Sequence, residues 1–156
     1  MRGKNPYVNM EDLVSSYFNR FNVDPSVLPN VIQAVGVALK GEARAAQKET
    51  FPQRTGKFNK SIWFKQRRRG SRATLYAGNL ASIYERNGAF IQPMKGEAIK
   101  FEINGKTVFY KGVIRIPARP YFYSAMREAI SNGVDKRAAE QQINREFMRH
   151  SIVSKY

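Results

Sequence analysis

The stretch RIPARPYF, residues 115–122, lies directly before a helical pattern and tells most about the chain. Its two prolines, Pro117 and Pro120, each set their own φ angle and push the preceding residue out of the helical region. Ile116 and Arg119 are therefore expected to be extended. Pro120 can also begin a helix, where a missing N–H costs nothing. The stretch predicts a rigid corner from a strand into a helix, with the planar cation of Arg119 at its apex.

Apolar periodicity and helix-end residues predict the helices around this corner. The first follows Asn9, which with Asp12 resembles a capping box, and the second follows the stop-and-restart pair Asp24-Pro25. The expected helical stretches are residues 10–21, residues 29–49, a short stretch 80–86 capped by Asn79, and a long C-terminal helix from Pro120 to Met148, kinked or interrupted at Asn132-Gly133.

Two β-hairpins are expected between these helices. Aromatic and β-branched residues favour one hairpin from residues 61–66 and 73–77. The Asn104-Gly105 turn favours another, from residues 97–103 and 107–113. Strands grouped between helices indicate an α+β fold. We expect one antiparallel sheet built from the two hairpins, with helices packed on one side of it and a long C-terminal helix.

Length and composition predict a single domain of 156 residues. Its expected parts are a helical N-terminal part (1–50), a central part with the hairpins and short helix (51–118), and the C-terminal helix and tail (119–156). With no cysteine, the chain has no disulfide, no thiolate chemistry and no cysteine-based metal site. No apolar run approaches the ~20 residues of a membrane span, and no secretory signal opens the chain. No membrane partner is therefore expected.

Positive charge is concentrated in one segment. The net charge is +15, and residues 51–80 hold eight basic residues and no acidic one. The turn of the first hairpin carries a cluster that we call the basic hairpin: Lys65, Arg67, Arg68, Arg69 and Arg72. Such a field favours a polyanion, either nucleic acid or an acidic protein surface. A third interpretation is that the turn contacts no partner and only keeps the protein soluble. The sequence does not decide whether a contact would be with DNA or with protein.

The residues for catalysis are sparse. The chain has one histidine, His150, so neither a histidine-based triad nor a histidine-rich metal site can be assembled. The carboxylates are scattered, and Glu97 and Glu102 would point to opposite faces of one strand. The glycines lie in turns and form no phosphate-binding fingerprint. We expect no enzymatic activity, no cofactor and no metal.

Two further signatures precede the corner: RTGKFNKSI, residues 54–62, and YERNG, residues 84–88. With the Tyr76-Ala77 pair and the corner, they resemble the tail-completion proteins of long-tailed bacteriophages, a family also called head–tail joining, neck or phage morphogenesis proteins. The family's marks fall on Thr55, Gly56, Ser61, Tyr84, Glu85, Pro117, Arg119, Pro120 and Tyr121. The chain departs from the family by one extra residue between Glu85 and Gly88 and by a hairpin of its own between Gly88 and Gly112.

The resemblance implies a structural virion protein that joins the head-side connector to the tail tube as a ring of six, or twelve, copies. The implied partners are other copies of the chain, a head-completion or connector protein, and a tail tube or tail terminator protein, with contact to the passing genomic DNA left open. The implied location is the virion neck, and the host cytoplasm during assembly. It also suggests an ion pair between Glu85 and Arg119. The alternatives are a tail terminator of the same particle and, from another class, a small basic nucleic-acid-binding module.

Overall fold

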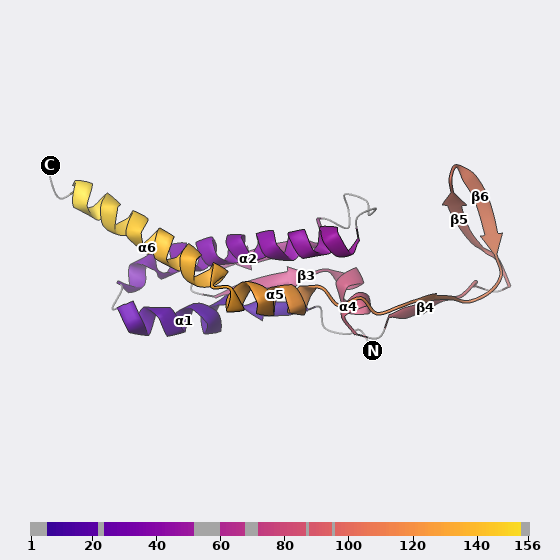
Figure 1. The fold of residues 1–156 in the computed structure, drawn as a ribbon, viewed down its shortest axis with the longest axis horizontal. Helices are drawn as coiled ribbons and strands as arrows, with labels where there is room; N and C mark the ends of the chain where they lie inside the picture. The colour runs from indigo at the N-terminus through magenta and orange to yellow at the C-terminus, as the bar shows by residue number, and fades with distance from the viewer. Residues whose placement is uncertain are drawn as a thin grey trace.

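The fold is α+β, as expected, with long helices packed beside short antiparallel strands (Figure 1). The computed structural model describes residues 6–21, 24–51, 60–67, 72–86, 88–94 and 96–153. Thr55 and Gly56 of the first signature, and Arg68 and Arg69 of the basic hairpin, lie outside the described residues.

The helices follow the expected pattern closely. They are α1 (Met10–Phe21), the 3-10 turn η1 (Pro25–Val27), α2 (Leu28–Thr50), α4 (Asn79–Glu85), α5 (Phe122–Ser131) and α6 (Val134–Val153). The predicted interruption of the last helix is confirmed, because Asn132 and Gly133 separate α5 from α6 and Gly133 takes a φ of 70°. That angle belongs to the left-handed region, which glycine adopts without a steric penalty.

The helix caps confirm two sequence predictions and correct a third. Asn9 Oδ1 accepts a hydrogen bond from the Glu11 N–H at 3.2 Å, and Asn9 Nδ2 donates to Asp12 at 2.9 Å. Asp24 accepts from the Ser26 N–H at 2.8 Å and so caps η1. The expected Asn79 cap is wrong, since Asn79 is already helical and Gly78 occupies the N-cap in an extended conformation.

The main sheet has three antiparallel strands in the order β1-β3-β2: β1 (Tyr7–Asn9), β2 (Ile62–Gln66) and β3 (Ala73–Ala77). The β2–β3 hairpin was expected, whereas β1 was not. Alternate side chains of these strands are buried toward α2, among them Ile62 and Leu75. Gly36 of α2 makes room for this packing, because a Cβ there would collide with the ring of Phe64.

The second hairpin, β5 (Ile99–Ile103) with β6 (Lys106–Tyr110), forms a sheet of its own. The expectation of one sheet built from both hairpins is therefore corrected. Two short strands, β4 (Ala89–Ile91) and β7 (Ile114–Ile116), pair with each other. β4 leads the chain away from the three-stranded sheet before β5 begins, and β7 leads it back after β6. We call β4 to β7 the arm. Figure 1 shows the arm extending from one end of the molecule and α6 from the other.

The hydrophobic core lies in the body, around α2. This helix packs against the three-stranded sheet, α5 and α6. Fully or almost fully buried side chains from these elements form the centre: Val31, Ile32, Val35 and Leu39 of α2, Ile62 and Leu75 of the sheet, and Phe122 and Met126 of α5. The burial of this cluster drives folding of the body, and the hairpin of the arm adds no side chain to it.

Candidate assembly interface

The corner leads from β7 into α5 as expected, but α5 begins at Phe122 with Tyr121 as its N-cap, and not at Pro120. The carboxylate at the corner also has a different partner from the one expected. Residues 117–120 are exposed and belong to no helix or strand, and the Arg119 N–H donates to the Tyr84 carbonyl at 2.9 Å. Glu85 Oε1 accepts hydrogen bonds from the N–H groups of Tyr121, at 2.6 Å, and Phe122. These N–H groups open α5, so the carboxylate of α4 caps the positive end of that helix.

The expected ion pair between Glu85 and Arg119 is wrong. Within the described part of the chain, no ion pair joins the two residues, and the side chain of Arg119 is exposed. Helix-opening N–H groups need an acceptor when they are shielded from water, whereas an exposed guanidinium is already solvated. The amides of α5 therefore take the carboxylate, and Arg119 is left on the surface of the corner.

A buried cluster behind the corner joins the motif residues. Tyr121 is 2% exposed, and its hydroxyl accepts a hydrogen bond from Gln47 Nε2 at 3.1 Å. The same Nε2 donates to Ser61 Oγ at 3.0 Å. The Phe51 ring lies 4.5 Å from the Tyr84 ring and 5.7 Å, edge-on, from the Tyr121 ring. Burial raises the pKa of Tyr121 to about 12, while the hydrogen bond from Gln47 acts in the opposite direction.

This cluster determines how the arm leaves the body. Ser61, Tyr84, Glu85 and Tyr121 meet there, which the sequence suggested only through their membership of one motif set. Gly88 follows directly, with a φ of 71°, and a Cβ on it would collide with the Ile116 carbonyl. The two segments that connect the arm to the body, at Gly88 and at Ile116, therefore lie in direct backbone contact. Gln47 and Phe51 were not predicted from the sequence. The position of a glutamine among the apolar residues of α2 could have indicated a buried polar contact.

The described residues at the end of the β2–β3 hairpin lie beside the beginnings of α1 and α2, since Arg72 is near Glu11 and Gln66 Nε2 donates to the Pro29 carbonyl at 2.8 Å. Lys65, Arg67 and Arg72 are exposed, and the Arg67 N–H donates to the Arg72 carbonyl at 3.1 Å. Arg72 Nε lies 4.0 Å from Glu11 Oε2 on α1, a largely exposed pair of small energetic value. The described cations of the cluster therefore stay accessible to a polyanion.

The arm exposes many apolar side chains. Of the thirteen large apolar side chains that are exposed in the described part of the chain, seven belong to the arm and its loops. These seven are Phe90, Ile91, Met94, Ile103, Phe109, Tyr110 and Val113. The cross-strand pairs Ile99–Tyr110 and Phe101–Val108 share one face of the β5–β6 hairpin with Ile103. An isolated two-stranded hairpin is only marginally stable in water, so this face indicates a partner surface.

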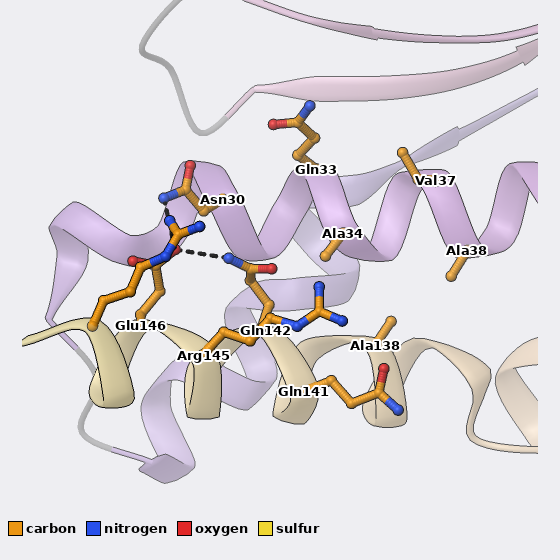
Figure 2. Close-up of a pocket in the computed structure, with 11 residues that line it drawn as sticks. Asn30, Gln33, Ala34, Val37, Ala38, Ala138, Gln141, Gln142, Arg145 and Glu146 are labelled. Carbon is orange, nitrogen blue, oxygen red and sulfur yellow. Dashed lines mark hydrogen bonds and ion pairs between the residues drawn. The ribbon is translucent and has the colours of Figure 1, made fainter. Parts of the chain in front are cut away.

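A hollow of about 450 Å³ lies between α2 and α6. Figure 2 shows Asn30 and Gln142 directed at the Glu146 carboxylate. Glu146 Oε1 accepts from Asn30 Nδ2 at 3.1 Å and from Gln142 Nε2 at 2.7 Å. These three groups bond to one another. The rest of the lining consists of Gln33, Ala34, Val37, Ala38, Ala138, Gln141, Arg145 and Arg149. We interpret the hollow as the seam between two helices.

No group of three or more histidine, aspartate or glutamate residues in the part of the chain that the structure describes could hold a metal ion. None of the described helices combines the length and the apolar character needed to cross a bilayer.

No family model, curated protein or solved structure matches this chain. Its function is therefore inferred from its residues, their geometry and the motif resemblance.

Proposed function

We propose that the protein is a structural subunit of the neck of a long-tailed bacteriophage, where identical copies form a ring between the head-side connector and the tail tube. The protein acts through binding, without catalysis. The observation that carries this proposal is the arm, whose hairpin exposes an apolar face to solvent and is held to the body by a well-connected corner.

The exposed face of the arm requires a partner. The strands β5 and β6 place Ile99, Phe101 and Ile103 beside Val108 and Tyr110. Covering these side chains would remove apolar area from water at roughly 25 cal/mol per Å². A second copy of the chain is the partner that the phage resemblance implies.

The elongated form of the molecule favours a ring. The arm and α6 extend from opposite ends of the body (Figure 1). An arm that packs on the far end of a neighbour makes a head-to-tail contact, in which each subunit presents two different surfaces. Such a contact repeats from copy to copy, and it closes into a ring when the rotation per subunit divides a full turn.

The corner supports the same proposal because ring closure depends on the angle between arm and body. Glu85 holds the first turn of α5, and Gly88 lets the base of the arm pass against Ile116. A tail terminator would use the same kind of ring, and this alternative stays open. The nucleic-acid alternative rests on a different surface, the three-stranded sheet with the basic hairpin.

The proposal is tested with the purified full-length chain by native mass spectrometry over a range of concentrations. We expect a ring of six or twelve copies. Replacing Ile103 and Tyr110 by serine should abolish the ring, since both side chains lie on the apolar face. The matched control is Phe109→Ser, which changes an exposed apolar residue on the opposite face of the same hairpin.

A chain that stays monomeric at every concentration, or forms a ring that the double variant does not weaken, would argue against the arm contact. A symmetric dimer would indicate that two arms pair with each other, which is an isologous contact and does not build a ring. Circular dichroism of each variant shows whether the body has kept its fold.

A further inference from the structure

The three-stranded sheet has a second, outer face, and three aromatic side chains line up across it. The strand register places Tyr7 of β1 opposite Tyr76 of β3, and Tyr76 opposite Trp63 of β2. Residues at paired positions point to the same face of a sheet, and neighbouring strands are about 4.8 Å apart. Tyr7, Tyr76 and Trp63 therefore form one continuous row, which we call the aromatic row.

The aromatic row is open to solvent. Tyr7 is 50% exposed, Trp63 is 40% exposed, and Tyr76 between them is partly exposed. The Trp63 and Tyr76 rings lie 5.9 Å apart and are nearly parallel, with 27° between their planes. Gly78 faces the edge of the Trp63 ring, where an added Cβ would come within 3.3 Å of it. The backbone at Gly78 therefore packs against the edge of the indole.

Positively charged side chains lie on the same face of the sheet, at the end nearer the basic hairpin. The next row of the sheet consists of Asn9, Thr74 and Lys65. Arg67 and Arg72 follow at the end of the strands, both exposed. Among the described residues of the three strands, the outward side chains include three aromatics and one lysine but no acid. The face therefore combines flat rings with cations at one end.

The composition of this face differs from that of the arm. The arm exposes mainly isoleucine, valine, methionine and phenylalanine, with Tyr110 as its one tyrosine, whereas the aromatic row consists entirely of two tyrosines and a tryptophan, which keep a polar atom at their edge. Rings of this kind beside cations match the two parts of an unpaired nucleotide: a base that stacks and a phosphate that carries charge. Duplex DNA offers the charge but keeps its bases stacked inside the helix.

We propose that this outer face binds single-stranded nucleic acid. Bases stack on Trp63, Tyr76 and Tyr7, and the backbone phosphates contact Lys65, Arg67 and Arg72. The proposal does not depend on the ring, because it uses a different surface and would apply equally to a monomer.

The chain reports on this site directly because Trp63 is its one tryptophan. Titration of the full-length protein with an oligothymidylate of about twelve nucleotides should quench the tryptophan fluorescence when a base stacks on the indole. Three phosphate contacts predict that log K falls against log salt concentration with a slope of about −2. A duplex of the same length should bind more weakly and leave the fluorescence nearly unchanged.

Variants separate stacking from charge, with binding measured by the anisotropy of a labelled oligonucleotide. Trp63→Ala should weaken binding roughly tenfold, and Trp63→Phe should restore most of the loss. Tyr7→Ala is a second test on another strand, in case Trp63→Ala fails to fold. Lys65→Ser should reduce the salt slope by about 0.7. The matched controls are Phe109→Ala and Lys106→Ser, which change exposed residues of the arm.

Equal affinity for duplex and single strand, with no loss in Trp63→Ala and Tyr7→Ala, would overturn the proposal in favour of charge alone. An absence of oligonucleotide binding at low salt would overturn it in favour of an acidic protein surface as the partner. Either result leaves the ring untouched, since ring formation is measured by native mass without nucleic acid.

Discussion

The Glu85 carboxylate of α4 accepts a hydrogen bond from the Tyr121 N–H at 2.6 Å and thereby caps α5, whose N-cap residue Tyr121 lies 36 residues later in the chain. A carboxylate is the group that best matches the positive end of a helix dipole. Because α4 precedes the arm and α5 follows it, this contact holds the two ends of the arm together. The stability of the corner and the direction of the arm are therefore linked.

Replacing Glu85 by alanine should lower the free energy of unfolding by about 1–2 kcal/mol, because two N–H groups of α5 lose their acceptor. Glu85→Gln should cost less, since the amide oxygen still accepts but carries no charge. Urea unfolding followed by circular dichroism measures both. Glu97→Ala removes an exposed carboxylate of the arm and is the control. An equal loss in Glu85→Ala and in the control would contradict the capping role.

Arg119→Lys should leave the free energy of unfolding unchanged to within about 0.5 kcal/mol, because the guanidinium is exposed and not bound to Glu85. The comparison with Glu85→Ala in the same urea experiment makes the test sensitive. A loss of more than about 1 kcal/mol in Arg119→Lys would mean that the fork geometry of the guanidinium contributes to the corner after all.

Gly88→Ala should destabilise the corner more than Gly96→Ala, by at least about 1 kcal/mol. Both glycines have positive φ, 71° and 78°, so both substitutions strain the backbone. Only Gly88 faces a carbonyl, that of Ile116, while nothing lies within 4 Å of a Cβ on Gly96. Hydrogen exchange of the β4 and β7 amides, together with urea unfolding, measures the difference. Equal effects of the two substitutions would show that the close approach of the backbones is unimportant.

Tyr121 predicts a loss of stability at high pH. Its pKa is about 12 in the folded protein, whereas the ordinary pKa of a tyrosine is 10.0. The unfolded state therefore releases this proton first, and the stability contributed by the neutral phenol is complete below pH 10.0 and falls as the pH rises toward 12. The unfolding free energy of the wild-type chain should drop more steeply over that range than that of Tyr121→Phe. Parallel curves for the two proteins would contradict this assignment.

Local chemistry made much of the fold predictable from the sequence. Asn9 and Asp24 act as helix caps, Asn104-Gly105 forms the turn of the second hairpin, and Gly133 separates the last two helices. Each of these features depends on residues within a few positions of one another. The strands β1 and β4 were not predicted, because three residues are too few to show an alternating pattern.

Features that depend on distant parts of the chain were not predictable in the same way. The partner of Glu85 was assigned to the cation of Arg119, whereas the structure gives it the backbone of Tyr121 and Phe122. The pairing was based on opposite charge and on the resemblance, which implies that both residues lie near the same end of the sheet. The sequence indicated a helix start at this corner but did not show which distant side chain would accept from its N–H groups. The aromatic row was hidden for a related reason, since it includes Tyr7 only through the unpredicted pairing of β1 with β3.

The most direct test of the neck proposal is quantitative mass spectrometry of particles purified from the source, with the amount of this chain normalised to the portal protein. A closed neck ring predicts a fixed stoichiometry that corresponds to about six or twelve copies per particle. Absence of the chain from purified particles would contradict the proposal.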